Sequence, residues 1–454
     1  MARKDEDNIH LGLQQHDHVN RVTLRAPSLS LRLWLEPMNK LFPRLRDLSL
    51  SSTTIEEVNV VLPETLRAPD LRHLVLHGVG LPAGFPLLAS TISLSTLSMT
   101  HIGASCYFPP GHLVTQLQFL PNLEELSIGF DIPIPLPSSE GELLPPPVPP
   151  VTLPNLRRLT FRGVDIYIDN LVAQIITTLL ERLSLTLFFD LAFTLVNLAE
   201  FILGTEGFGC PVSWVIFNKD GASIDTGHGQ RGTERLSLHV YCESLDWQID
   251  SATLVCGALE KVLSNVEELI LDLDVDGIPS DWESSPDGML WYELLLPFIG
   301  VKKLYIGSSL TLELSQTLEL VAGGLVLEIL PELNELEVQL EFDDAKNAFS
   351  TFLETRESVG HPVLLLASLI PHAEPEVLRA DPEVLPTDPE VLYADPEVPR
   401  ATSEEHPIDS TTVLDYMDYI GRPYQNQAIV LIDLCRCFIG EQELTSRSYD
   451  ALRR

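Results

Sequence analysis

The sequence predicts an α/β chain of the leucine-rich-repeat type: an irregular solenoid with a curved parallel sheet on its concave side and helices on its convex side. Residues 154–161 read PNLRRLTF, and the apolar pattern of this stretch recurs in ten other places. Successive copies lie roughly 23 to 35 residues apart, apart from a single larger gap between the copies at Leu183 and Leu236, and this spacing suits one strand plus a returning helix. Several of the intervals carry helical periodicity. The recurring strand pattern, the helical periodicity between copies and the regular spacing together favour a repeat architecture over a single large core.

Each copy supplies one strand. The last two apolar residues of a copy are separated by one position, so both point to one side of a strand while the residue between them points to the other. Aligned on Leu156, Leu159 and Phe161, the other copies are Val19/Val22/Leu24, Leu45/Leu48/Leu50, Leu71/Leu74/Leu76, Leu94/Leu97/Met99, Leu123/Leu126/Ile128, Leu180/Leu183/Leu185, the weaker Glu234/Leu236/Leu238, Val266/Leu269/Leu271, Val301/Leu304/Ile306 and Leu333/Leu336/Val338.

Helical patterns precede the next strand in five intervals: residues 111–120, 170–180, 251–264, 287–298 and 312–330. Parallel strands joined by right-handed crossovers bend a repetitive chain into an arc. A generic leucine-rich α/β domain is the competing interpretation. Its buried strands would be continuously apolar, whereas alternation is kept in these copies, and this favours the solenoid.

The predicted organisation begins with a flexible terminus, residues 1–16, where a short helix is the alternative that would cap the first strand. The repeats occupy residues 17–357 and end on a closing helix that runs through Arg356. Residues 131–151, DIPIPLPSSEGELLPPPVPPV, form a proline-rich loop because proline at this density excludes helix and central strand. An irregular repeat is expected over residues 188–224, where 196–203 fits strand and helix equally well.

The composition changes after the repeats. Residues 371–403 contain the echoes DPEVL and DPEVP at a period of seven, and a proline in every unit forbids a continuous helix. This stretch is predicted to be a disordered acidic linker. Residues 409–454 regain apolar and aromatic residues and are predicted to form a short helical segment.

The chain is strongly acidic, with a formal net charge of −36. Residues 121–370 hold 38 acidic and 12 basic side chains, whereas residues 1–120 hold ten of each. Such a surface excludes nucleic acid and anionic membranes as partners, because phosphate binding needs clustered Lys and Arg. Six cysteines with no CxxC pair and no framework spacing, and an amino terminus without an apolar core, indicate an intracellular protein, cytoplasmic or nuclear.

The most tempting site for chemistry is residues 272–283, DLDVDGIPSDWE, which match a calcium-loop template. Alternating apolar residues around Asp272 indicate a strand instead of a helix end, and Pro279 stands where the template needs a free N–H. Glycine clusters lack the order that cradles phosphate, and no nucleophile motif is present. We therefore expect no enzyme, no cofactor and no metal.

The informative surface is the row of side chains between the apolar strand positions. A basic strip is predicted on the concave side, formed by Arg158, Arg162, Arg182, Arg235 and His239. It is a predicted binding site for an acidic or phosphorylated segment of a partner protein. The alternative is structural: Glu125 beside Arg158, and Lys303 beside Glu335, form cross-strand ion pairs.

The motifs LFPRLRDLSL, PDLRHLVLHGV, LPNLEELSIGF, LPNLRRLTFRGV and LPELNELEV, over roughly residues 17–342, resemble those of the fungal F-box and leucine-rich-repeat-like proteins. The resemblance implies a substrate receptor of a cullin-based ubiquitin ligase, in which an F-box holds the adaptor Skp1 and the repeats hold the target. No F-box-type segment precedes the first strand, so Skp1 and cullin are expected only if the full gene product carries an F-box. Thr53, Val79, Ile102 and Val164 replace the Asn that closes many such repeats.

The expected function is therefore non-enzymatic protein binding by an F-box-like leucine-rich-repeat receptor. A stand-alone acidic horseshoe that binds or inhibits a basic protein is the alternative.

Overall fold

The computed structural model describes residues 3–434 of the 454-residue chain, apart from residues 55–59, 83, 85, 132–149, 189–195, 230–232, 243, 275–287, 323–327 and 369–428. The side chains of residues 3–8, 288, 320–322 and 429–434 are not described either. The predictions of a proline-rich loop at 131–151 and of a disordered linker at 371–403 thus lie almost wholly outside the described residues.

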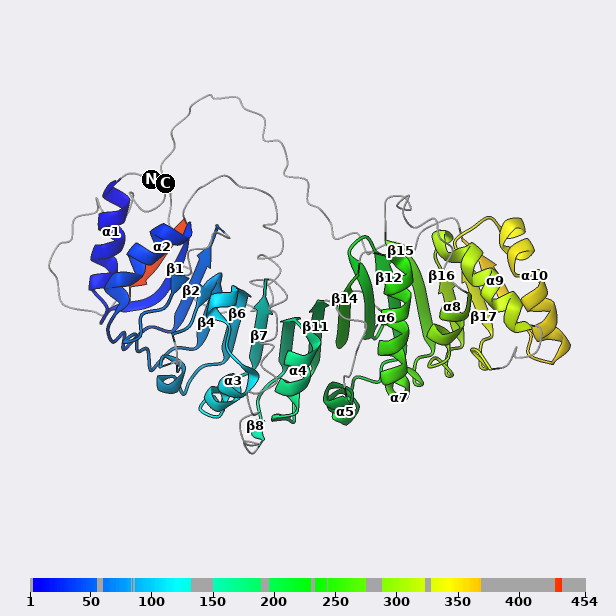
Figure 1. The fold of residues 1–454 in the computed structure, drawn as a ribbon, viewed down its shortest axis with the longest axis horizontal. Helices are drawn as coiled ribbons and strands as arrows, with labels where there is room; N and C mark the ends of the chain where they lie inside the picture. The colour runs from blue at the N-terminus through cyan, green and yellow to red at the C-terminus, as the bar shows by residue number, and fades with distance from the viewer. Residues whose placement is uncertain are drawn as a thin grey trace, which may run out of the picture. The chain divides into compact units, whose positions relative to one another are not determined.

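One large sheet of fifteen strands organises the chain, in the order β18-β17-β16-β15-β12-β13-β14-β11-β9-β7-β6-β4-β2-β1-β19 (Figure 1). Neighbouring strands are parallel except at β19–β1, β12–β13 and β13–β14. Two small parallel pairs lie apart from it: β3 (Val60–Val61) with β5 (Val79–Gly80), and β8 (Val151–Leu153) with β10 (Ile175–Thr177). The strands of the large sheet are β1 (Val19–Ala26), β2 (Asp47–Ser52), β4 (His73–His77), β6 (Thr96–Ile102), β7 (Glu125–Phe130), β9 (Arg158–Gly163), β11 (Arg182–Phe188), β12 (Val212–Asn218), β13 (Gly221–Gly227), β14 (Leu236–Tyr241), β15 (Glu268–Asp274), β16 (Lys303–Ile306), β17 (Glu335–Val338), β18 (Leu364–Ala367) and β19 (Ile429–Leu434).

The predicted strand leucines lie in one sheet and form one core. Phe161 pairs with Ile128 on one side and with Leu185 on the other, and the same register continues through neighbouring strands. All of these side chains are buried, as are Leu24, Leu50 and Val338 farther along the sheet. The mostly parallel α/β fold and the inward orientation of the repeated leucines are therefore confirmed.

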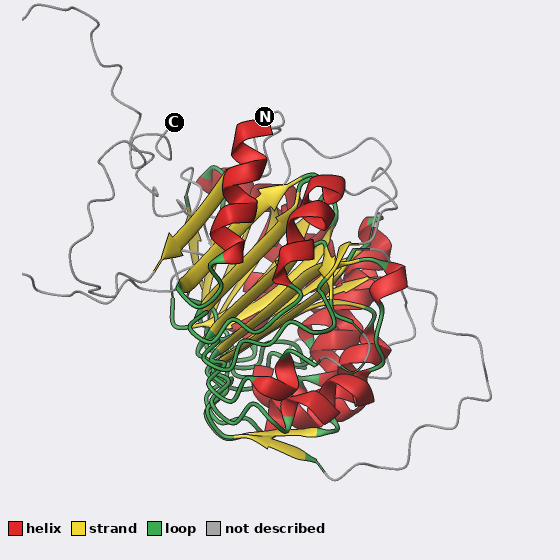
Figure 2. Ribbon diagram, turned by 90° about the vertical axis from the view of Figure 1, so that its left-hand side faces the viewer, coloured by secondary structure: helices red, strands yellow, loops and turns green. Residues whose placement is uncertain are grey.

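Helices cover the face of the sheet on which those leucines lie (Figure 2). Neighbouring helices pack on one another, as α6 does on α8, α8 on α9 and α9 on α10. The prediction of a helix at residues 170–180 is partly wrong, because helix α4 begins before residue 170 and strand β10 (Ile175–Thr177) follows it. The helices are α2 (Ser28–Leu35), α3 (Pro110–Leu117), α4 (Asp165–Val172), α5 (Val196–Gly204), α6 (Leu245–Ala258), α7 (Glu260–Leu263), α8 (Gly288–Leu295), α9 (Thr311–Ala322) and α10 (Phe342–Ser358).

The irregular repeat is a hairpin inserted into the parallel sheet. After β11 and α5, the chain forms β12, turns back through β13 and returns along β14, which pairs directly with β11. Residues 196–203, ambiguous in sequence, are helical. The core row stays continuous through the insertion, because Leu238, Ile224, Val215 and Leu271 occupy successive paired positions.

The ends of the chain differ from the prediction. Residues 3–14, expected to be flexible, form helix α1 (Arg3–Gln14), in which Ile9 and Leu13 are buried. The alternative prediction of a short capping helix therefore describes this end better. Residues 429–434, expected to be helical, form strand β19, which pairs antiparallel with β1. Their sequence, IVLIDL, is rich in β-branched residues, and the free edge of β1 supplies a ladder for them.

Candidate functional site

The face of the large sheet opposite the leucine core is called here the open face. On β9 it is lined by Arg158, Thr160 and Arg162, which alternate with the buried Leu159 and Phe161. Three strands that are adjacent in space, β9, β11 and β14, carry the predicted basic strip, and Arg235 lies immediately before β14.

Arg158 and Arg182 occupy paired positions on β9 and β11. The guanidinium of Arg158 forms an ion pair with Glu125 of β7. This pair is the one that the structural interpretation predicts. Arg182 has no ion-pair partner within the described part of the chain, so its charge is not compensated there.

Arg162 lies between two aromatic rings of neighbouring strands. Its guanidinium carbon is 5.1 Å from the ring centroid of Phe188 and 5.6 Å from that of Tyr241. A guanidinium on an aromatic face is held by the quadrupole of the ring and keeps its full charge. Phe188 and Tyr241 fix the orientation of Arg162 without neutralising it.

His239 belongs to the strip by position but not by charge. Its Nδ1 lies 2.8 Å from the Ser223 hydroxyl of β13. Burial lowers the pKa of His239, the charge of Arg162 lowers it further, and Asp220 opposes the shift only in part. The imidazole is therefore neutral at pH 7 and acts as a hydrogen-bonding group.

Arg235 is exposed and donates a hydrogen bond of 3.2 Å to the carbonyl oxygen of Gly207. A backbone carbonyl leaves the charge of the guanidinium in place. The structure thus places all five predicted residues on or beside three adjacent strands. Three arginines, Arg162, Arg182 and Arg235, supply charge that no described carboxylate pairs with.

A row of small hydroxyl side chains runs between the cations. Ser127, Thr160, Ser184 and Ser237 occupy successive paired positions on β7, β9, β11 and β14. Short hydroxyls leave room above the sheet and offer donors and acceptors. Arginines beside hydroxyls can bind a carboxylate or a phosphate through charge-assisted hydrogen bonds.

Beyond the hairpin the open face has different chemistry. Val212, Trp214, Ile216, Ile270 and Tyr305 form a small apolar cluster on it, separate from the leucine core. On the next strands Lys303 contacts Glu335 and Glu337, each at 3.0 Å, as the structural interpretation predicts for Glu335. Sequence reasoning missed the apolar cluster, although the unbroken apolar run of residues 214–217 was a signal for a strand buried on both faces.

A second polar cluster sits at a β-bulge between Met99 and Ile102. His101 adopts a left-handed φ of 54° there, which turns its ring onto that of His77 at a centroid distance of 4.0 Å. His101 is paired with Asp131, and His77 Nδ1 lies 3.0 Å from the Thr100 hydroxyl. No sequence signal marked this bulge.

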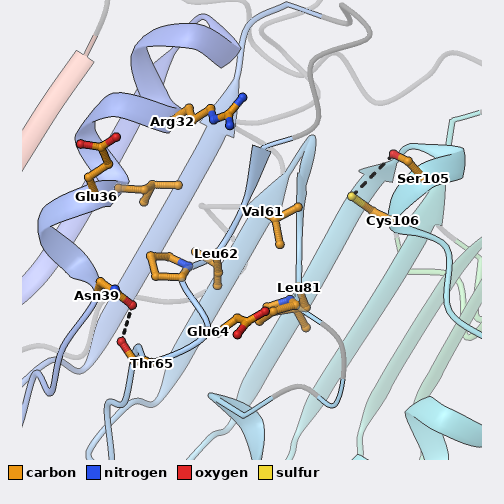
Figure 3. A pocket seen from close by; sticks show the side chains of 13 residues that line it. Arg32, Glu36, Asn39, Val61, Leu62, Glu64, Thr65, Leu81, Ser105 and Cys106 are labelled. Carbon is orange, nitrogen blue, oxygen red and sulfur yellow. Dashed lines mark hydrogen bonds between the residues drawn. The ribbon is translucent and has the colours of Figure 1, made fainter.

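A hollow of 810 Å³ is lined by residues of α2, by Val61 of β3 and by Leu81, which follows β5 (Figure 3). Arg32, Glu36 and Glu64 line it together with Cys106, whose Sγ is 4.0 Å from Ser105 Oγ. Burial raises the pKa of the Cys106 thiol, and the Ser105 contact only partly offsets this. A thiol with a raised pKa is a poor nucleophile at neutral pH.

Within the described ranges, no group of three or more His, Cys, Asp or Glu side chains is placed to hold a metal ion. Of the calcium-loop candidate, Asp272 and Asp274 lie in β15, while residues 275–283 fall outside the described chain. The four described cysteines are free thiols. None of the described helices is long and apolar enough to cross a membrane. No protein-family model matches the chain, and a search of curated proteins finds no relative.

Proposed function

We propose that this chain is a non-enzymatic, intracellular protein-binding receptor of the irregular leucine-rich-repeat type. Its open face is the concave side of a solenoid, and the strip of Arg158, Arg162, Arg182, Arg235 and His239 binds an acidic or phosphorylated segment of a partner protein. In the version implied by the sequence resemblance, the partner is a target for ubiquitin ligation. Skp1 and cullin then join only through an F-box in the full gene product.

One observation carries this proposal. Three arginines lie on or beside three adjacent strands of a chain with a net charge of −36, and no described carboxylate pairs with them. Lys303, in contrast, is neutralised by two glutamates. Like charges gathered without counter-charges cost folding free energy, and an anionic ligand offsets that cost.

The test uses the full chain as bait in a cell lysate and quantifies the retained proteins by mass spectrometry. Arg182→Glu is expected to lower retention of the specific partner at least about tenfold, because a reversed charge faces the partner's anion. Lys261→Glu, an equal charge change at an exposed position of α7, is the matched control and is expected to retain the partner. A captured set that survives both Arg158→Glu and Arg182→Glu contradicts the proposal.

The acidic part of the open face supports a second candidate, a scaffold or inhibitor for a basic protein. Five carboxylates occupy open-face positions of β15 and β17: Glu268, Asp272, Asp274, Glu335 and Glu337. Lys303 of β16 lies between the two strands. Co-purification separates the candidates. Recovery of Skp1 and cullin supports the ligase receptor, whereas a basic protein released by salt supports the scaffold.

A further inference from the structure

In β18 only alternate residues form backbone hydrogen bonds with the neighbouring strand β17. The N–H of Leu364 donates to Asn334 O at 2.9 Å, and the N–H of Ser368 donates to Val338 O at 3.0 Å. In a parallel pair, alternate residues direct both backbone groups to the same neighbour. The backbone groups of Leu365 and Ala367 therefore point away from β17, and no described strand lies on that side.

The side chains of β18 are left incompletely covered on both faces of the sheet. Leu364 is 59% exposed and Leu366 is 37% exposed on the open face. Leu365 and Ala367 lie on the core face and pack against the leucine core, yet neither reaches full burial. The corresponding positions of β17, Leu336 and Val338, are fully buried. A further strand beside β18 would complete both layers.

The stretch of sequence that leads up to this edge is strongly acidic. Residues 311–367 contain eleven Asp and Glu but only two Lys and Arg. Of the two cations, Arg356 is fully buried. On β17, Glu335 and Glu337 both contact the ammonium of Lys303, and these two carboxylates occupy the positions paired with Leu364 and Leu366.

We propose that the free edge of β18 is a strand-addition site for an extended, basic segment of another protein, in which apolar residues alternate with Lys or Arg. The added strand pairs with the outward backbone groups of Leu365 and Ala367. Its apolar side chains continue the leucine core on the inner face. Its basic side chains lie on the open face, where their aliphatic stems cover Leu364 and Leu366 and their charged ends reach Glu335 and Glu337.

Charge decides between this occupant and a second copy of the chain. Two copies that met at this edge would bring two acidic surfaces together, each belonging to a chain of net charge −36. Like-charge juxtaposition at an interface opposes association. A basic strand has the complementary sign and so is favoured.

The binding test uses a labelled eight-residue peptide of alternating valine and lysine, titrated with the full chain and followed by fluorescence anisotropy. Saturable binding is expected. A peptide N-methylated at the residues that face β18 is expected to bind at least about tenfold more weakly, because it lacks the backbone donors. The same peptide with glutamate in place of lysine is expected not to bind. Equal binding by the N-methylated peptide would show charge attraction alone and overturn the proposal.

A variant of the chain tests the same edge from the other side. Ala367→Pro removes an outward N–H without removing a bond to β17 and is expected to weaken binding at least about tenfold. Ala367→Ser keeps the donor and is expected to bind within about twofold of the natural chain. In hydrogen exchange, the peptide is expected to slow the amides of Leu365 and Ala367. Unchanged exchange there, or a dimer in sedimentation that Ala367→Pro abolishes, would contradict a basic peptide as the occupant.

Discussion

The two ends of the large sheet differ in how completely other elements cover the core there. At the first end, α1 buries Leu13, every core-facing residue of β1 is buried, and β19 pairs with the outer edge of β1. At the other end, α10 covers the face of the sheet that carries the leucine core through Phe349 and Phe352, while the edge strand β18 has no fully buried residue. A sheet whose core lies on one face leaves part of that core exposed wherever no further strand or helix covers it. One end has a cap, and the other offers a surface.

The largest effect is expected at Arg356, which anchors the helical side of the β18 end. Its guanidinium donates to the carbonyl oxygens of Leu330, Pro331 and Leu333 and is fully buried. Arg356→Leu leaves these acceptors without their donor and is expected to lower the free energy of unfolding by about 4 kcal/mol in urea denaturation. Lys346→Leu, an exposed position of the same helix, is the control and is expected to change it by less than about 0.5 kcal/mol.

A matched pair of leucines compares a covered strand with the uncovered one. Leu336 of β17 and Leu365 of β18 occupy paired positions in the sheet. Leu336→Ala is expected to cost about 3 kcal/mol because it leaves a cavity, whereas Leu365→Ala is expected to cost about 1 kcal/mol. Equal losses in parallel urea titrations would mean that β18 is as well covered as its neighbour.

At the capped end, α1 is expected to contribute through Leu13. Leu13→Ala is expected to lower the free energy of unfolding by about 2 kcal/mol, since a terminal helix can settle into part of the space. Leu11, on the same helix, is 58% exposed, so Leu11→Ala is expected to be neutral within about 0.5 kcal/mol. Should the two variants melt alike, α1 does not act as a cap.

The smallest effect is a pH dependence that arises near the capped end, at His77. Burial lowers its pKa to about 4, with a further contribution from the charge of His101 that Asp131 only partly opposes. The unfolded chain takes up this proton near pH 6.5, whereas the folded chain does not until about pH 4, so stability falls as pH drops through that window. His77→Gln is expected to show a smaller loss of stability between pH 7 and pH 5, with exposed His112→Gln as the control. An NMR titration that places the folded pKa of His77 near 6.5 would contradict this.

Periodicity in the sequence located most of the fold. The spacing of apolar residues was enough to place Leu159, Phe161 and their counterparts in the core, because each copy must bury the same face. The order of the strands around the hairpin was not predictable, since β12 and β13 carry no copy of the repeat and β14 carries only the weaker one. The apolar run of β18, LLLA, was too short to mark a strand.

The candidate site was predictable in position but not in character. The residues that lie between core positions had to face the other side, and this located Arg158, Arg162 and Arg182. Their partners depend on neighbours in space. The Glu125 ion pair was anticipated from adjacent copies, whereas the contacts of Arg162 with Phe188 and Tyr241 and the neutral state of His239 depend on the inserted hairpin and on burial.

The most direct test of the proposed binding face places a photo-crosslinking residue at one position at a time in the full chain. Thr160, exposed at the centre of the open face, is expected to cross-link the captured partner. His112, exposed on α3 on the helical side, is expected not to cross-link it. A partner that cross-links at His112 and not at Thr160 would contradict the assignment of the open face as the binding surface.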